Sequence, residues 1–303
     1  MKLNGITKNR NGVDLCKITF CPSCNSDLIY DNNKIICSKC IKTYNFKEGV
    51  PVLMDKPFSI DLFSNLDTES AWESYDTESI NPKIAKFSSK AKSIFQKLTP
   101  HYRVQTGPNY MDFIEKYVKK GNILDLGGGP CGIKYPGVVN CDINNYETVD
   151  IIADARKLPF KNNSFKAIIC NSVLEHIFES DMVVDECHRI LENNGYIFMC
   201  VPQVCSQHHT IDYFRWTIPG LKKQFDKFNI VDKGVILGPS VFISQIFVGV
   251  FRSFTRFSFL NNLICLFLEI ILFPLRFLDL LIKNNEDYQH FAHTIYIIGK
   301  KEI

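Results

Sequence analysis

The stretch GNILDLGGGPCG at residues 121–132 decides the class of fold. Its apolar residues Ile123, Leu124 and Leu126 indicate a buried parallel strand, and the glycines after them indicate a tight turn at its carboxyl end. In open α/β sheets nucleotide-like ligands bind at that edge, because glycine lets the backbone approach them closely. One glycine-rich turn is a weak signal, so the sequence downstream has to support it.

Further apolar segments follow the glycine turn at regular intervals. Strands are expected at residues 137–142, 149–155, 166–170 and 196–202, with a last, antiparallel strand at 294–300. Helices are expected at 110–120 and 181–191, with a turn at 192–195. Strands that alternate with helices indicate an α/β protein with a doubly wound, mainly parallel sheet.

Four motifs occur in order: LDLGGG at 124–129, DARKLPFKNNSF at 154–165, LEH at 174–176 and RILENNG at 189–195. In these motifs the chain resembles the class I S-adenosylmethionine-dependent methyltransferases, in particular the methyltransferase type 11 branch, over roughly residues 121–233. The resemblance implies a Rossmann-like sheet of seven strands and S-adenosyl-L-methionine as cofactor.

The resemblance also assigns cofactor contacts by position. Its glycines pass the methionine part of the cofactor, and the acid that ends the second strand, Asp142, holds the ribose. Asp154 with Ala155 meets the adenine edge, and Asn171 lines the floor of the site. The residues expected to bind the cofactor are Asp125, Gly127, Gly129, Asp142, Asp154, Ala155 and Asn171.

The glycine loop departs from the family pattern. Cys131 stands where a further glycine is usual, and Gly132 comes one place late. Pro130 and Pro136 leave room for at most one or two helical turns before the second strand. A dinucleotide-dependent dehydrogenase needs a longer helix there to meet its phosphates, so methyl transfer is favoured over that alternative.

Two Cys-x-x-Cys pairs precede the catalytic motifs. They lie at residues 21–24 and 37–40, separated by a segment whose alternation predicts a hairpin, and residues 44–53 are expected to form a closing strand. Four thiolates in this spacing indicate a closed structural Zn²⁺ site in a small zinc ribbon, with redox pairs as the alternative. The predicted ligands are Cys21, Cys24, Cys37 and Cys40, and Cys16 is expected to be a spectator.

The chain divides into three regions on composition. We expect a zinc ribbon at 1–56, a linker with lid helices at 57–108 and the methyltransferase domain at 109–303, with an apolar insertion at about 239–285. Twelve cysteines without an apolar leader favour a cytoplasmic, reducing location. A net charge of +3 gives no strong indication of nucleic acid as a partner.

The segment after the fifth strand, residues 208–219, predicts a substrate lid. Related methyltransferases carry a similar Asp-Tyr-x-Arg-x-Thr stretch here. His208 or His209 is the expected general base, and Asp212 or Arg215 would orient the acceptor. His176 is a second candidate for the base, and a purely structural cap is the alternative for the whole segment.

Residues 235–282 form an unusually apolar arm. Charged residues and Pro274 interrupt it, so no run of about 18 apolar residues long enough to span a membrane is present. Asn262, Glu269, Arg276 and Lys283 recur every seven residues, which predicts a narrow polar stripe on a broad apolar helix. Such a helix fits a peripheral membrane contact at the inner face of the membrane, a homodimer contact through 239–283, or the core.

Three functions fit these features. The leading one is an S-adenosylmethionine-dependent methyltransferase that transfers a methyl group in line to oxygen or nitrogen of a small-molecule, glycan or lipid-linked acceptor. The alternative is a zinc-ribbon rRNA methyltransferase, which the apolar arm fits poorly. The third is a non-catalytic, methyltransferase-like adaptor.

Overall fold

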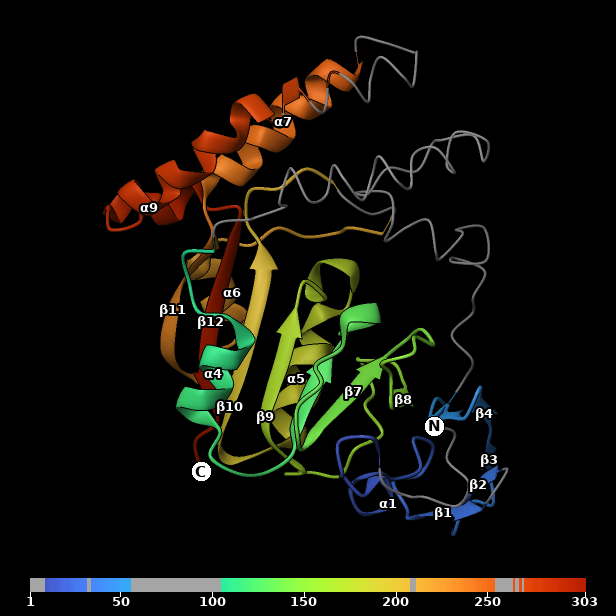
Figure 1. The fold of residues 1–303 in the computed structure, drawn as a ribbon. Helices are drawn as coiled ribbons and strands as arrows, with labels where there is room; N and C mark the ends of the chain where they lie inside the picture. Colours follow the sequence, from blue (N-terminus) through green and yellow to red (C-terminus); the bar gives the residue numbers. More distant parts are fainter. Residues whose placement is uncertain are drawn as a thin grey trace, which may run out of the picture.

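The computed structural model describes residues 9–31, 34–55, 105–207, 211–253 and 270–303, together with residues 264, 267 and 268. Its centre is a seven-stranded sheet in the order β11-β12-β10-β9-β6-β7-β8 (Figure 1). The strands are β6 (Ile123–Leu126), β7 (Val138–Asp142), β8 (Ile151–Ile152), β9 (Phe165–Asn171), β10 (Leu191–Pro202), β11 (Asn229–Leu237) and β12 (Thr294–Lys300).

The topology confirms the predicted doubly wound, mainly parallel sheet. Strands β6 to β10 pair in parallel with their neighbours, whereas β12 runs antiparallel to both β10 and β11. The expected antiparallel last strand is therefore present. All parallel strands end at one edge, called the carboxyl edge below, and the start of β12 lies at the same edge because Thr294 pairs with Pro202.

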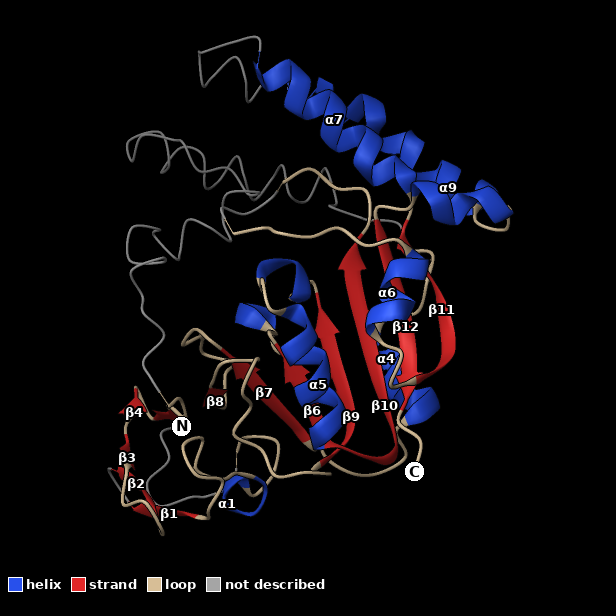
Figure 2. Cartoon of the chain, turned by 180° about the vertical axis from the view of Figure 1, so that it is seen from behind, coloured by secondary structure: helices blue, strands red, loops and turns tan. Residues whose placement is uncertain are grey.

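Helices cover both faces of the sheet (Figure 2). In that view α5 and α6 lie in front of the strands and α4 lies behind them. Successive residues of β9 alternate between the two sides, as strand geometry requires: Ile168 belongs to one buried cluster and Ile169 to the other. The helical elements of this part are α4 (Tyr110–Tyr117), η2 (Gly129–Cys131), η3 (Leu174–His176), α5 (Ser180–Ile190) and α6 (Ile218–Gln224).

Local signals account for most element boundaries. Helix α4 begins at a capping box, in which the Asn109 side chain accepts from Met111 N and Asp112 N. The crossover from β6 to β7 contains only the single turn η2, as the two prolines predicted. The turn predicted at 192–195 is wrong: those residues belong to β10, whose pairing with β9 shifts register between Leu191 and Tyr196.

The amino-terminal segment forms the predicted hairpin but not the predicted closing strand. Strands β1 and β2 pair antiparallel, with Leu28 opposite Cys37. The chain then turns at Glu48 and Gly49, which both have positive φ, so residues 44–53 form short pieces and not one strand. The elements are α1 (Leu15–Ile18), β1 (Leu28–Asp31), β2 (Lys34–Cys37), β3 (Thr43–Tyr44), β4 (Phe46–Lys47) and β5 (Val50–Pro51).

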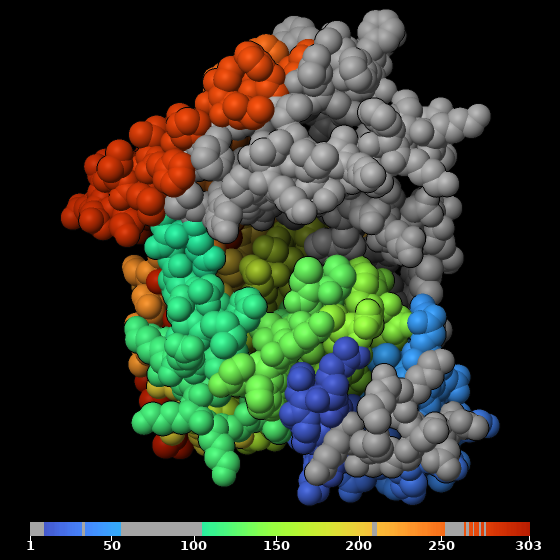
Figure 3. Space-filling model, viewed as in Figure 1, coloured from blue at the N-terminus to red at the C-terminus, as the bar shows by residue number. Residues whose placement is uncertain are grey.

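This segment, called the ribbon below, closes one side of the large sheet. Val52 pairs in parallel with Ile152 of the edge strand β8, and Leu53 N donates to Ile152 O over 2.9 Å. Buried ribbon residues such as Leu15 and Ile35 share one core with the sheet. In the space-filling view the blue ribbon packs directly against the green catalytic part (Figure 3). The ribbon therefore covers a sheet edge that would otherwise be open to pairing.

A helical arm follows β11. It starts later than residue 235, because 235–237 are still part of β11, and Pro274 lies in a 3₁₀ segment that interrupts the expected helix. Figures 1 and 2 both show α7 beside α9, above the carboxyl edge of the sheet. The described elements are α7 (Pro239–Ser253), η4 (Phe273–Phe277) and α9 (Leu278–Ile282), followed by η5 (Glu286–Phe291).

Within the described residues, the search for a helix long and apolar enough to cross a bilayer finds none. Of the predicted polar stripe, Lys283 is exposed, and the side chains of Asn262, Glu269 and Arg276 lie outside the described set.

Candidate cofactor site and metal centre

The glycine loop after β6 adopts a backbone that side chains disfavour. Gly127 and Gly129 have φ of +72° and +56°, in the left-handed region. A Cβ at Gly127 would lie 2.3 Å from Val173 Cγ2, so the loop packs against the turn that follows β9. Gly127 N donates to Cys141 O over 2.8 Å, which ties the loop to β7. The loop is thus held between two parallel strands at the carboxyl edge.

Asp142 ends β7 and faces this loop. Its side chain accepts from Gly129 N over 3.1 Å at Oδ2 and from Asn144 N over 2.8 Å at Oδ1. Burial raises the pKa of the Asp142 carboxyl, and the backbone hydrogen bonds oppose that shift. A carboxylate has about four lone-pair sites, so these two bonds leave acceptor capacity for the hydroxyls of a ribose. The position of Asp142 fits its predicted role.

Asp125, in strand β6, holds the glycine loop in place through its side chain. Its Oδ2 accepts from Ile133 N over 2.9 Å, and a Cβ at Gly128 would lie only 2.3 Å from the same oxygen. Burial raises the pKa of the Asp125 carboxyl to about 6. These contacts make Asp125 a brace of the glycine loop, and its predicted contact with the cofactor stays a prediction.

Asp154 and its neighbours form an ion-pair cluster that the motif did not indicate. The Arg156 guanidinium grips the Asp154 carboxylate, with Nε at 3.0 Å from Oδ1 and NH2 at 2.7 Å from Oδ2. Arg156 NH1 also donates to Glu179 Oε2 over 2.8 Å, just before α5. Ala155 is buried, whereas Asn171 is exposed at the end of β9. Arg156 therefore fixes the loop that was expected to meet the adenine.

The predicted lid begins beyond β10. His208 and His209 lie outside the described residues, so the expected base is not placed. The Asp212 carboxylate has no exposed surface and pairs with Arg215, whose NH2 lies 2.7 Å from Asp212 Oδ2. Arg215 Nε also donates to Cys205 O over 3.2 Å. The described contacts of Asp212 hold the lid together.

The LEH motif anchors the lid from beneath. Tyr213 N donates to Glu175 O over 2.7 Å, and His176 Nδ1 lies 2.5 Å from Ile211 O. Burial raises the pKa of the fully buried Glu175 carboxyl to about 8, with a smaller contribution from the charge of Asp212. Glu175 was not predicted as a site residue, although it is the central residue of a motif that the sequence displays.

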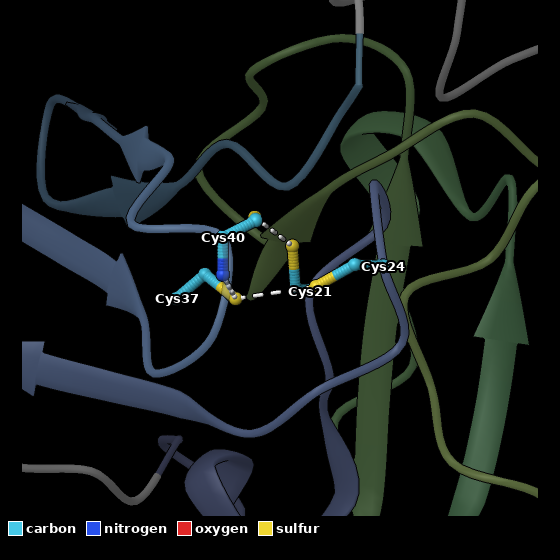
Figure 4. A group of neighbouring side chains, drawn as sticks. All are labelled: Cys21, Cys24, Cys37 and Cys40. Atoms are coloured by element: carbon cyan, nitrogen blue, oxygen red, sulfur yellow. Dashed lines mark hydrogen bonds between the residues drawn. The ribbon is translucent and has the colours of Figure 1, made fainter.

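The four predicted metal ligands come together in the ribbon (Figure 4). Their sulfur atoms all lie within 4.8 Å of one another, and the Sγ atoms of Cys24 and Cys37 are 3.4 Å apart. Zn–S bonds of 2.3 Å in a tetrahedron place sulfurs about 3.8 Å apart, so the cluster fits structural Zn²⁺. Lys39 N and Cys40 N point at Cys37 Sγ over 3.4 and 3.3 Å, as expected around a thiolate ligand.

Hydrogen bonds connect the four-cysteine cluster to the loop after β8. Cys21 Sγ and Ser23 Oγ each lie 3.0 Å from Tyr44 OH, and Ser23 Oγ donates to Asp55. Lys157 Nζ, next to Arg156 in the sequence, lies 3.3 Å from Asp55 Oδ2. The ribbon thus contacts the same loop that carries Asp154.

Comparison with known proteins agrees with this architecture. Residues 136–199, which include Asp142, Asp154 and Asn171, match the family model described as "Methyltransferase domain". Together with the sheet order and the antiparallel last strand, this match supports an S-adenosylmethionine-dependent methyltransferase of class I fold that follows an amino-terminal ribbon with a four-cysteine cluster. Among curated protein sequences, none matches the chain significantly.

Solved structures are similar to part of the chain. The [4+2]-cyclase SpnF shares 14% identity over 63% of this chain and 78% of its own, with a TM-score of 0.38. Phosphoethanolamine N-methyltransferase 2 of Haemonchus contortus, solved with S-adenosyl-L-methionine, shares 14% identity over 64% of this chain and 52% of its own, with a TM-score of 0.37. Protein PH0226 of Pyrococcus horikoshii shares 20% identity over 47% and 92%, with a TM-score of 0.33.

Proposed function

We propose that this methyltransferase transfers a methyl group in line to oxygen or nitrogen of a small-molecule, glycan or lipid-linked acceptor. The observation that carries the proposal is the buried carboxylate of Asp142, which lies at the end of β7 and accepts from the backbone of the glycine loop. This arrangement offers acceptors for a ribose beside a close backbone approach, and it needs no phosphate-binding helix.

The residues at the carboxyl edge fit S-adenosyl-L-methionine. Gly127 and Gly129 present backbone without side chains where the methionine part would pass, and Asp142 would accept from the ribose hydroxyls. The loop with Asp154 and Ala155 would border the adenine, with Arg156 holding that loop in place. S-Adenosyl-L-methionine supplies an activated sulfonium methyl group, so the chain needs no nucleophile of its own.

The protein's contribution is then to hold the acceptor in line with the methyl group. Holding the two groups near contact lowers the activation barrier by several kcal/mol, because the entropy of orienting them is lost on binding and not during the reaction. The lid supplies that geometry in our proposal: Asp212 and Arg215 brace it, and His176 anchors it through Ile211. A hydroxyl acceptor needs a base for its proton, and His208 or His209 remains our candidate.

The acceptor class is tested by transfer of labelled methyl groups from S-adenosyl-L-methionine into a fractionated extract of the source cell. We expect label in lipid-linked, polysaccharide or small-molecule fractions, and less of it with a His208→Ala/His209→Ala double variant. Label in RNA would overturn the acceptor class and make the ribbon a substrate-docking module. If the unaltered protein bound no S-adenosylhomocysteine, the adaptor alternative would replace the enzyme.

A further inference from the structure

One face of helix α7, called its inner face below, contacts the β10–β12 side of the carboxyl edge. Gln245 Oε1 lies 3.2 Å from His293 Nε2 and 4.0 Å from Sγ of Cys205, which precedes the lid. At the start of the same helix Ser240 is buried, and its backbone N donates to Asp279 of α9 over 3.3 Å. The arm therefore contacts the residues next to β10 and β12, and its helices α7 and α9 contact each other.

His293 fixes where this contact lies. It directly precedes β12, and its backbone N donates to Leu237 O while its O accepts from Gln203 N, both over 2.9 Å. The ring is buried, with Nδ1 at 2.7 Å from Thr294 Oγ1. This group is at the carboxyl edge on the β10–β12 side, whereas the glycine loop lies on the β6–β7 side. In the proposed function the cofactor occupies the β6–β7 side, which leaves the β10–β12 side for the acceptor, and α7 borders that side.

The outer face of α7 is apolar and exposed. Ile243, Ile246, Phe247 and Val250 are between 38% and 49% exposed and follow the i, i+3, i+4, i+7 spacing of one helical face. Leu281 of α9 is 79% exposed, and residues 239–251 contain no charged residue. In the space-filling view these orange-red helices lie at the upper left of the molecule (Figure 3). Such an apolar patch marks an interaction surface.

The length of α7 and the net charge of the arm indicate what binds to this surface. Helix α7 has 15 residues, about 22 Å, which is short of the hydrocarbon thickness of a bilayer. Residues 239–283 carry four basic side chains against two acidic ones, namely Arg252, Arg256, Arg276 and Lys283 against Glu269 and Asp279. Asp279 is buried against Ser240, so the excess of positive charge fits an anionic lipid surface. Two copies of the arm would place like net charges together.

We propose that α7 and α9 form an interfacial anchor on an anionic bilayer, and that the inner face of α7 is the membrane-side wall of the acceptor site. The acceptor then reaches the site from the membrane. Of the small-molecule, glycan and lipid-linked acceptors in the proposed function, this favours the lipid-linked class. This last step rests on the proposed methyl transfer, whereas the anchoring does not.

The anchoring is tested by sedimentation of the full chain with vesicles of phosphatidylglycerol and phosphatidylcholine in equal parts, and with phosphatidylcholine alone. The unaltered protein should bind the anionic vesicles more tightly. A Phe247→Ser/Leu281→Ser variant should bind them at least about tenfold more weakly. Both side chains are exposed in the free protein, and the variant could no longer bury their apolar surface in the bilayer. Val231→Ser, at a position on β11 that is 42% exposed, should bind as the unaltered protein does.

Thermal melting of the three proteins should be the same, which separates loss of anchoring from loss of folding. Absence of vesicle binding by the unaltered protein would overturn the proposal, as would equal binding by the double variant. If sedimentation equilibrium shows a dimer that the double variant dissociates, the arm is a contact between copies, and the anchor is rejected.

The wall is tested separately with Gln245→Ala. This variant should keep its vesicle binding and its affinity for S-adenosylhomocysteine, while labelled methyl transfer into a membrane lipid extract falls at least about tenfold. Unchanged transfer would reject the wall. If the unaltered protein labelled no fraction at all and bound no S-adenosylhomocysteine, the proposed function would fail and the vesicle result would stand by itself.

Discussion

The two sides of the carboxyl edge are built differently. On the β6–β7 side, buried carboxylates hold the glycine loop in place: Asp125 and Asp142 each accept a hydrogen bond from a backbone amide of the loop. The glycines leave the backbone of this loop without side chains. On the β10–β12 side, side chains from separate elements meet, such as Asp212 with Arg215 and Gln245 with His293. A site built from the backbone suits a cofactor that is the same in all such enzymes. A surface built from side chains suits an acceptor that differs from one enzyme to the next.

The largest effect should follow loss of the Zn²⁺ that the four cysteines of the ribbon would hold. Cys37→Ser should abolish the bound Zn²⁺ and lower the melting temperature of the whole domain, because the ribbon shares the sheet's core. Metal binding supplies on the order of 10 kcal/mol in isolated zinc modules. Metal analysis and calorimetry measure both effects, and Cys16→Ser is the control that should keep its metal. Retained metal in Cys37→Ser would contradict the assignment.

Next in size is the pair Gly127→Ala and Gly129→Ala. Both residues have positive φ, which costs an alanine about 1 kcal/mol. Only the Cβ at Gly127 meets another atom, Val173 Cγ2 at 2.3 Å, so its variant should lose about 2 kcal/mol more stability than the Gly129 variant. Urea unfolding would compare them, and equal losses would show that the loop does not pack on Val173.

Beneath the lid, Glu175 should make the free energy of unfolding depend on pH. Its folded pKa of about 8 lies above the ordinary value of 4.5, so folding retains a proton that the unfolded chain releases. Stability should therefore fall as pH rises from about 4.5 to about 8. Glu175→Gln removes this loss and should gain at least about 2 kcal/mol over the unaltered protein at pH 8, with little gain at pH 5. A pH-independent difference would mean that Glu175 is charged in the fold.

The smallest effect should come from the exposed ion pair between Lys157 and Asp55. Its Lys157 side chain is 54% exposed, so water and salt screen the interaction. Lys157→Ala should change the free energy of unfolding by no more than about 0.5 kcal/mol. A loss above about 1 kcal/mol would show that this pair, and not the shared core, joins the ribbon to the cofactor loop.

The sequence predicted the sheet and the clustering of the four cysteines because both depend on short-range patterns. Apolar runs that end in glycine or an acid indicate buried parallel strands, and paired Cys-x-x-Cys spacing indicates a four-cysteine cluster. It did not predict that Val52 pairs with Ile152, because contacts across 100 residues leave no local pattern. Arg156 and Glu175 were missed as well, since their roles depend on which charges folding brings together.

The most direct test of the account is calorimetric titration of the unaltered protein and of Asp142→Ala with S-adenosylhomocysteine. Because Asp142 would lose charge-assisted hydrogen bonds to the ribose, we expect binding by the unaltered protein and at least about tenfold weaker binding by the variant. Asp185→Ala, which changes an exposed aspartate on α5, should bind normally. Equal affinity of the unaltered protein and Asp142→Ala would contradict the proposed cofactor site.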